Sequence, residues 1–361
     1  MSEFDLIRQY FRRPQPPGVL GVGDDCALLP AQAGSWAIST DLLLEGRHFF
    51  GDVDPASLGH KALAVNLSDL AAMGAEPRGC VLGLGLPSVD HAWIAPFADA
   101  FHALAEAHHC PLVGGDTTRS ADGICISVTV FGHLDARRAL RRDGARAGDD
   151  IWVSGPLGDA ELALHLLLAE RAPWRDIQPL PVLQGDTSSP VMGTKSSPPV
   201  ADDGELEDWI RTLAPARRQW LLASTRERLE RPQPRVALGR ALAGLAHAAI
   251  DISDGLVQDL GHILRASGCG AALSAALLPL SDAMRTVPVP IAWRMALGGG
   301  DAYELCFTAP ASERGHIQRL GRALGLELTR IGETLPQEGL FVYDGQGQLL
   351  ASVPRGFDHF A

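Results

Sequence analysis

The chain has 361 residues, of which 46% are apolar and 20% are charged, and its formal net charge at pH 7 is −12. This length is long for a single hydrophobic core and suits two domains, while the apolar content is that of a globular protein. The negative charge argues against nucleic acid or an anionic membrane as the main partner, although an acidic enzyme can still bind phosphates through metal ions.

The first 147 residues predict one α/β domain, because strand-like and helix-like segments alternate along them. An amphipathic helix is expected over 2–12 and a longer helix over 55–75, with Gly74 as its stop. The strand over 35–46 is expected to end near Asp41. The remaining segments are strands at 19–30 and 79–87, a helix at 89–109, a short strand into a glycine turn at 110–120, and a strand at 123–134.

Residues 148–361 predict a second α/β domain, in which a strand, a glycine turn and a helix recur. The closing stretch is expected to form a hairpin that turns at Asp344 and Gly345. The recurring segments are 149–170, 250–264 and 298–310, the last followed by a helix over 312–324.

The segment 179–204 interrupts this second domain and is rich in Pro, Ser, Gly and Thr. Such a composition buries too little apolar surface to offset the entropy lost on ordering. We therefore predict a flexible surface insertion at about 172–215, away from every motif.

Lysine and cysteine usage excludes several kinds of functional site. Lysine occurs only at Lys61 and Lys195, so no G-x-x-x-x-G-K-[ST] phosphate loop is present. The six cysteines show neither a C-x-x-C pair nor zinc spacing, and no stretch is apolar enough for a signal core or a membrane span. We expect a reduced, cytoplasmic protein without a membrane partner.

Aspartates recur where strands end or glycines turn the chain, which is where α/β folds gather ligands. The neighbouring glycines let backbone N–H groups approach an anion closely. Simpler interpretations stay open: Asp24 and Asp25 can be turn formers, and Ser253 or Asp254 can cap the helix that follows. The candidates are Asp24, Asp25, Asp41, Asp69, Asp116, Asp251 and Asp254.

Asp69 is the hardest of these to explain as a structural residue. It lies among apolar neighbours on the expected helix, so its carboxylate is partly desolvated and needs a partner. Lys61 is about two helical turns away, and a metal ion is the better account. The acidic set offers hard oxygen ligands for more than one Mg²⁺, and Ser39 and Thr40 can add hydroxyl or carbonyl oxygens.

Phosphoryl transfer fits this inventory, because it needs alignment and charge neutralisation more than covalent chemistry from the protein. No activated Ser or Cys nucleophile is recognisable, so no catalytic side chain is expected beyond positioning and metal catalysis. With so little lysine, Mg²⁺ and arginines such as Arg142 must supply the positive charge. A solvated basic face is an equal interpretation for Arg142, which lies among four other arginines.

The motifs together resemble those of the thiamine-monophosphate kinase family, within the superfamily of aminoimidazole ribonucleotide synthetase-like ATP-using enzymes. The resemblance covers nearly the whole chain apart from 172–215. The segments that carry it are "GVGDDCALL", "AISTD", "KALAVNLSDLAAMGA", "VGGDTTR", "IDISDGLVQDLGHI", "YELCF" and "GFDHF".

The resemblance implies Mg²⁺-assisted, ATP-dependent phosphorylation of thiamine monophosphate to thiamine diphosphate by direct transfer. It implies an α/β (α+β) fold with an ATP- and Mg²⁺-binding domain over 1–147 and a C-terminal domain over 148–361. The N-terminal sheets would pair in a homodimer through the strands "AISTDLLL" and "ICISVTVF". The implied metal ligands are Asp25, Ser39, Thr40, Asp41, Asp69, Asp116, Asp251 and Asp254.

The same resemblance assigns the substrates. ATP would contact Gly115, Asp116, Arg142 and Ser253. Thiamine monophosphate would contact His48, Asp301 and Phe357, the last by stacking on a cationic ring. His48 as a surface histidine and Phe357 as a core or lid aromatic are the structural alternatives.

One motif departs from the family pattern. The family usually reads G-G-E-D-Y-E-L where this chain has "GGDAYEL", so Asp301 stands for the Glu and Ala302 for an Asp. Two other functions stay in view. Another ATP-using enzyme of the superfamily would keep the fold and change the substrate, and Asp301 and Ala302 favour a weakened Mg²⁺–nucleotide-binding regulatory protein.

Overall fold

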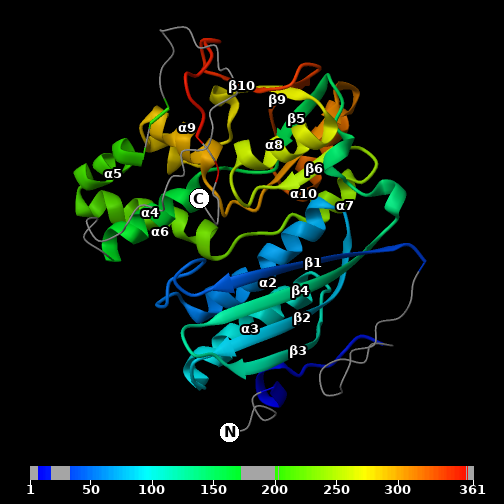
Figure 1. Cartoon of the computed structure of the whole chain (residues 1–361), viewed down its shortest axis with the longest axis vertical. Helices are drawn as coiled ribbons and strands as arrows, with labels where there is room; N and C mark the ends of the chain where they lie inside the picture. The colour runs from blue at the N-terminus through cyan, green and yellow to red at the C-terminus, as the bar shows by residue number, and fades with distance from the viewer. Residues whose placement is uncertain (1–6, 18–32, 172–199, 202, 355, 357–361) are drawn as a thin grey trace. The chain divides into compact units, whose positions relative to one another are not determined.

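The computed structural model describes residues 7–17, 33–171, 200–201, 203–354 and 356 (Figure 1). Its contacts divide the chain into two compact units. The first comprises Met1–Leu140 and Glu230–Gly244, and the second comprises Arg141–Leu229 and Leu245–Ala361. The sequence predicts a domain boundary at residue 147. In the structure the N-terminal part of the first unit ends at Leu140, and the later segment Glu230–Gly244 also belongs to that unit.

The first unit is built on one four-stranded sheet with the order β1-β4-β2-β3. β4 pairs antiparallel with both β1 and β2, whereas β2 and β3 are parallel. Two helices, α2 and α3, pack together on one face of this sheet (Figure 1). The elements are β1 (Ser35–Leu44), α2 (Pro55–Ala72), β2 (Glu76–Leu86), α3 (His91–Ala107), β3 (Leu112–Arg119), β4 (Cys125–Leu134) and α7 (Val236–Leu242).

Local sequence explains where α2 begins and ends. The Asp54 carboxylate accepts the N–H of Ser57 at 3.0 Å, and Pro55 takes the first helical turn, where its missing N–H costs nothing. Gly74 follows the helix with φ +70°, a conformation that glycine adopts without strain. The expected helix over 55–75 is thus confirmed, and its sides are buried almost all round.

Two expected strand ends are wrong. β1 continues past Asp41 to Leu44, and β3 runs through Gly114 and Gly115 to Arg119. In both cases a neighbouring strand supplies hydrogen bonds beyond the polar or glycine residues, which local sequence does not reveal. Asp41 and Asp116 are therefore strand residues with defined pleat faces.

The second unit contains a six-stranded sheet with the order β10-β7-β9-β5-β8-β6. Its pairings are antiparallel except for β10 with β7. Its strands are β5 (Asp149–Val153), β6 (Ala248–Asp251), β7 (Gly270–Ser274), β8 (Leu305–Pro310), β9 (Thr329–Leu335) and β10 (Leu340–Tyr343). Its helices are α4 (Asp159–Arg171), α5 (Asp203–Thr212), α6 (Pro215–Glu230), α8 (Leu256–Ser267), α9 (Val289–Gly298) and α10 (Arg314–Leu324).

Most expected elements of this unit are confirmed, including the strand–turn–helix at β6 and α8. Tyr343 bridges to Leu349 around the expected turn at Asp344. α5 lies within the expected flexible insertion but is an ordered helix, so the expected flexibility is wrong for these residues. Residues 172–199 of the insertion lie outside the described part. Residues 7–11 of the expected N-terminal helix form a short helical turn. No helix within the described ranges has the length and apolar character needed to span a membrane.

Candidate functional site

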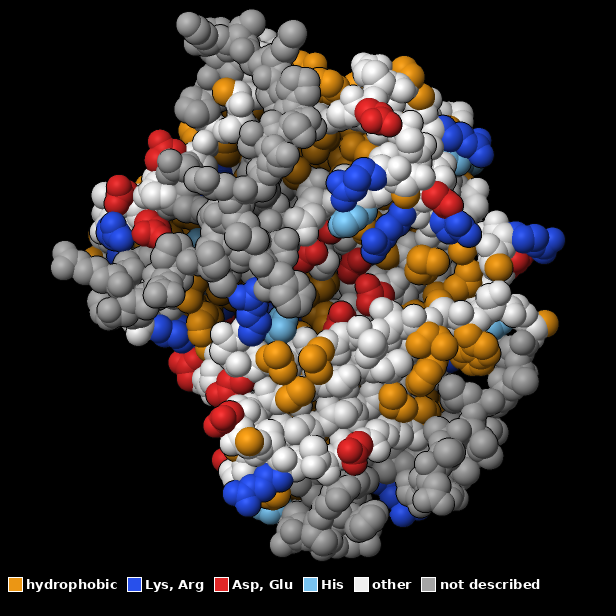
Figure 2. All heavy atoms as spheres, in the orientation of Figure 1, with side chains coloured by type: hydrophobic (Ala, Val, Ile, Leu, Met, Phe, Trp, Pro, Cys, Tyr) orange, Lys and Arg blue, Asp and Glu red, His pale blue; other side chains and the backbone are white. Residues whose placement is uncertain are grey.

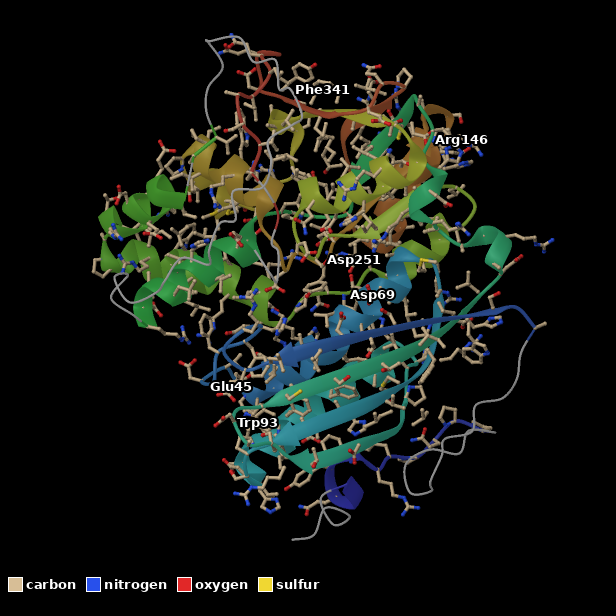
Figure 3. The ribbon with its side chains drawn as sticks, viewed as in Figure 1. Glu45, Asp69, Trp93, Arg146, Asp251 and Phe341 are labelled. Carbon is tan, nitrogen blue, oxygen red and sulfur yellow. The ribbon has the colours of Figure 1, made fainter. Side chains whose placement is uncertain are left out.

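Ser39, Asp41 and Asp69 come together in the first unit. Alternation along β1 turns Ser39 and Asp41 toward α2, which carries Asp69 near its C-terminal end (Figure 3). The Ser39 hydroxyl donates to Oδ2 of Asp69 at 2.6 Å. Burial and the negative charge of Asp69 raise the pKa of Asp41 to about 7. Two carboxylates thus share a confined space, as a cation site requires.

Asn66 belongs to this cluster and was not anticipated from the sequence. Its side-chain oxygen accepts the backbone N–H of Asp41 at 3.0 Å, and its amide nitrogen donates to the Ala62 carbonyl at 3.0 Å. Asn66 is 1% exposed, so both bonds are made in the protein interior. An amide within the apolar run "ALAVNLSDLAA" was the signal that could have revealed it.

The side chains of Thr40 and Asp116 do not join the cluster of Ser39, Asp41 and Asp69. Thr40 points to the opposite pleat face, where its hydroxyl donates to the Val128 carbonyl at 3.0 Å. Asp41 pairs with Val128 across β4, whereas Asp116 is exposed on β3 at the other edge of the sheet. Three strand spacings, roughly 14 Å, separate these edges. The Thr40 side chain and Asp116 are thus separate from the Ser39–Asp41–Asp69 cluster.

Gly115, an expected ATP contact, has a structural reason to be glycine. Its φ is +151°, and a Cβ at this position would lie 2.0 Å from the Leu82 carbonyl oxygen of β2. Gly114 beside it has no such restriction, because a Cβ there would meet only a Val81 methyl at 3.6 Å. The close approach of β2 and β3 therefore depends on the second glycine of "VGGD".

His48 lies just after β1 with one ring nitrogen fixed. The Leu44 N–H donates to Nδ1 of His48 at 2.9 Å, so Nδ1 carries no proton and Nε2 carries it. Nearby, Oε2 of Glu45 accepts the Ile124 N–H at 2.8 Å and ties this turn to the segment before β4 (Figure 3). The bond from Leu44 fixes the orientation of the His48 ring.

In the second unit, Asp251 ends β6 (Figure 3) and Asp254 follows in the turn before α8. Asp251 is 5% exposed, and Asp254 accepts the side-chain amide of Gln258 at 3.2 Å. Neither Ser253 nor Asp254 caps α8. Instead, Asp259 accepts the backbone N–H groups of residues 253, 254 and 255. Burial and the Asp254 charge raise the pKa of Asp259, although those N–H groups oppose the shift.

Two further segments lie against this turn. The Asp301 N–H donates to the Ser253 carbonyl at 2.8 Å, and Asp301 has φ +59°, a strained value for a non-glycine residue. From the C-terminal side, a Cβ on Gly356 would lie 2.6 Å from the Asp254 carbonyl oxygen. The substrate candidate Asp301 and the C-terminal Gly356 thus both lie against the Asp254 turn.

Arg142 is exposed beside α8. The Ser267 hydroxyl donates to its carbonyl at 2.8 Å. Burial lowers the pKa of His262 on α8, and the charges of Arg265 and Arg142 lower it further. Arg142 therefore adds positive charge near the helix that begins after Asp254.

The fit to a divalent cation can be judged from the donors themselves. Within the described residues, no three His, Cys, Asp or Glu side chains are grouped to hold a metal ion. Asp41 and Asp69 still suit Mg²⁺, which commonly binds one or two carboxylates and keeps several waters. Burial and the negative charge of Asp69 both raise the pKa of Asp41, and a bound cation would oppose both effects.

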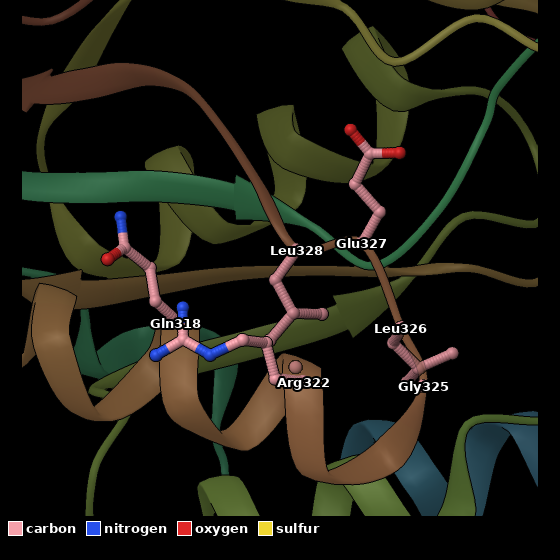
Figure 4. Close-up of a pocket in the computed structure, with 7 residues that line it drawn as sticks. Gln318, Arg322, Gly325, Leu326, Glu327 and Leu328 are labelled. Atoms are coloured by element: carbon pink, nitrogen blue, oxygen red, sulfur yellow. The ribbon is translucent and has the colours of Figure 1, made fainter.

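Three expected residues, Asp24, Asp25 and Phe357, lie outside the described part of the chain. A surface hollow elsewhere in the second unit is lined by residues 318–328 of α10 and the segment after it (Figure 4). None of its lining residues belongs to the acidic motifs, so it is not the candidate site.

Comparison with known proteins places this geometry in a family. The models of AIR synthase related protein, N-terminal domain, and AIR synthase related protein, C-terminal domain, match residues 23–134 and 211–345. A thiamine-monophosphate kinase of Escherichia coli (strain K12) is 42% identical over 367 residues, covering 100% of this chain and 98% of the relative. The chain belongs to the thiamine-monophosphate kinase family.

Solved structures of the thiamine-monophosphate kinase family share this fold. The enzyme of Stenotrophomonas maltophilia K279a has a TM-score of 0.74 at 41% identity, covering 92% of each chain. AaThiL complexed with AMPPCP and TMP has a TM-score of 0.68 at 29% identity, covering 94% of this chain and 92% of its own. The expected family and two-domain fold are confirmed, whereas the assignment of individual site residues stays a prediction.

Proposed function

We propose that this chain transfers the γ-phosphoryl group of ATP to thiamine monophosphate, giving thiamine diphosphate and ADP. The observation that carries the proposal is 42% identity over the whole chain to a thiamine-monophosphate kinase. AaThiL, complexed with AMPPCP and TMP, supports ATP and thiamine monophosphate as the two substrates. The aspartates of the two units can hold the divalent cations that such phosphate-bearing substrates need.

The reaction asks little covalent chemistry of the protein. An oxygen of the acceptor phosphate forms a bond to the γ-phosphorus, and the bond from that phosphorus to the β–γ bridging oxygen breaks. The acceptor oxygen is already anionic, so no strong general base is required. This agrees with the lack of a recognisable Ser or Cys nucleophile in the sequence.

Asp41 and Asp69 would hold Mg²⁺ in the first unit, with Asp25 as a further ligand. Asp251 and Asp254 would hold Mg²⁺ in the second unit. Bound Mg²⁺ would neutralise phosphate oxygens and align them for transfer. Ser39 keeps Asp69 oriented through its 2.6 Å hydrogen bond. Ligand roles for Asp116 and for the Thr40 carbonyl remain part of the proposal.

Substrate roles follow from the same loops. His48 would donate from Nε2 to the thiamine monophosphate end, because Nδ1 is occupied by the Leu44 N–H. Asp301, whose N–H donates to the Ser253 carbonyl next to Asp254, would contact that substrate, and Phe357 would contact it as well. ATP would contact Gly115, Asp116, Arg142 and Ser253.

We also infer a cytoplasmic homodimer. The outer face of β1 exposes a row of large apolar side chains, which Figure 2 shows as orange groups over the sheet of the first unit. Ile38 and Leu42 are 64% and 52% exposed, and a second copy would bury them. The five described cysteines are free thiols, which suits a reducing compartment.

Product analysis separates the candidate functions. The protein is incubated with Mg²⁺, ATP and thiamine monophosphate, and thiamine diphosphate is measured by chromatography. Thiamine diphosphate formation supports the proposal. Turnover of a different acceptor would indicate another enzyme of the superfamily, and ATP binding without any product would indicate a regulatory protein. The replacement of the usual Glu-Asp by Asp301 and Ala302 is the feature that favours the regulatory alternative.

A further inference from the structure

A single carboxylate, that of Asp259, accepts the backbone N–H groups of the turn between β6 and α8. Oδ2 of Asp259 accepts the N–H groups of Ser253, Asp254 and Gly255, each at 3.1 Å. Asp259 is 3% exposed, so these bonds are shielded from water. Three consecutive N–H groups converging on one point form the kind of nest that elsewhere binds phosphate. Here the protein fills that nest with its own side chain.

The opposite side of the same turn is fixed by backbone contacts. The Asp301 N–H donates to the Ser253 carbonyl, and the Tyr303 N–H donates to the Ile252 carbonyl, both at 2.8 Å. Gly255 has φ +121°, and a Cβ there would lie 2.5 Å from the Gly298 carbonyl oxygen. The turn is therefore clamped between the Asp259 carboxylate and the segment that carries Asp301.

We propose that Asp259 is a positioning residue that sets the metal-binding geometry of Asp254 and, through Ser253, the placement of Asp301. This rests on the proposed function, in which Asp254 binds a divalent cation and Asp301 contacts substrate. Asp259 touches neither, since its carboxylate is directed at the three backbone N–H groups. Substituting a residue that orients a metal ligand typically costs about 10- to 100-fold in metal affinity.

A carboxylate is better suited to this place than an amide of the same shape. Asp259→Asn keeps the side-chain volume but replaces one acceptor oxygen with an NH₂ group and removes the negative charge. Charge-assisted hydrogen bonds are roughly twice as strong as neutral ones, so the amide holds the three N–H groups more weakly. The turn then samples other conformations, and Asp254 is less often in place for the cation.

Asp344 provides a matched control in the same unit. It is 7% exposed, and its Oδ1 accepts the N–H groups of Gln346 and Gln348 at 2.8 Å each. Asp344→Asn therefore perturbs another buried aspartate that organises a turn, but one that belongs to no acidic motif. Any general cost of replacing such a carboxylate appears in both variants.

The test compares the affinity for Mn²⁺, a paramagnetic substitute for Mg²⁺, in the full-length wild type and both variants. Titrations are followed by electron paramagnetic resonance with a non-hydrolysable ATP analogue present. Asp259→Asn should weaken Mn²⁺ binding about 10-fold or more, and raise the Mg²⁺ concentration for half-maximal activity similarly, while Asp344→Asn leaves both unchanged. Wild-type Mn²⁺ affinity in a folded Asp259→Asn protein would overturn the proposal.

A second measurement covers the case in which Asp259→Asn does not fold. In the wild type, hydrogen exchange should be slow at the amides of Ser253, Asp254 and Gly255, because all three are bound to Asp259. Rapid exchange at these amides would overturn the proposal without any variant. If the wild type makes no thiamine diphosphate, the proposed function fails, whereas the Mn²⁺ and exchange results still report on Asp259.

Discussion

At the scale of single residues, the aspartates of this chain have different partners although they occur in similar sequence motifs. Asp69 accepts the Ser39 hydroxyl beside Asp41, whereas Asp259 accepts three backbone N–H groups. A buried carboxylate needs compensation from a donor or a cation. Both carboxylates receive hydrogen-bond donors in the fold, and the proposed cation at Asp69 is what would separate its role in chemistry from the structural role of Asp259.

Asp69→Asn should abolish phosphoryl transfer, because a neutral amide cannot replace the charge that binds Mg²⁺. Ser39→Ala removes only the hydrogen bond to Asp69 and should lower kcat/KM by about 10-fold. The exposed Asp122→Asn serves as the control with unchanged turnover. Steady-state assays of thiamine diphosphate formation measure all three, and wild-type turnover in Asp69→Asn would show that Asp69 is not a metal ligand.

At the scale of elements, two local features organise the first unit. Strand alternation on β1 places Ser39 and Asp41 on the face toward α2 and Thr40 on the other. Near the N-terminus, the helical turn Ile7–Phe11 docks on α3, where His102 bonds the Tyr10 carbonyl at 3.2 Å.

The two glycines of "VGGD" should respond differently to alanine. Gly115→Ala forces a Cβ toward the Leu82 carbonyl at an unfavourable φ, which should cost roughly 1–3 kcal/mol or more of stability. Gly114→Ala makes only an ordinary van der Waals contact and should be nearly neutral. Thermal unfolding followed by circular dichroism compares them, and equal Tm values for the two variants would contradict the close approach of β2 and β3 at Gly115.

His102 should make the protein less stable in mild acid. Burial, together with the Arg13 charge, lowers the pKa of His102 to about 4 in the folded protein. The unfolded histidine titrates near 6.5, so between these values the unfolded chain binds more protons and stability is lost as pH falls.

The His102 effect can be isolated by substitution. His102→Gln keeps a donor for the Tyr10 carbonyl but cannot titrate, so its Tm should fall less than that of the wild type between about pH 7.5 and about pH 5. Circular dichroism at both pH values measures this difference. An identical fall in the two proteins would show that His102 does not titrate in this window.

Much of the fold could be predicted from the sequence, because α2 and the main strands carry strong periodic patterns and clear stop signals. The family could also be predicted, since its motifs are distinctive in combination. The ends of β1 and β3 could not, because pairing with neighbouring strands extends them past Asp41 and Gly115. Asp259 was missed because its partners are backbone groups of a turn, which leave no mark in the sequence.

At the scale of the whole molecule, the proposed homodimer accounts for the apolar outer face of β1. Trp36 and Leu44 continue the row of Ile38 and Leu42 on that face, at 39% and 38% exposure. Such a row in an otherwise acidic protein is costly to leave in water. The sheet itself has one face covered by helices and one that a second copy would cover.

Paired Ile38→Glu and Leu42→Glu substitutions should convert the dimer to a monomer, because burying two carboxylates on this face is strongly unfavourable. Val89→Glu is the control, since Val89 is 50% exposed and follows β2 rather than facing out from the sheet. Size-exclusion chromatography with light scattering reports the mass of each protein. A monomeric wild type at micromolar concentration would contradict the proposed interface.

The central claim is that these aspartates hold divalent cations that bind a polyphosphate. An anomalous difference map from crystals grown with Mn²⁺ and a non-hydrolysable ATP analogue tests it most directly. We expect Mn²⁺ peaks beside Asp41 and Asp69 and beside Asp251 and Asp254, each within coordination distance of a phosphate oxygen. A map with bound nucleotide but no Mn²⁺ at either pair of aspartates would contradict the account.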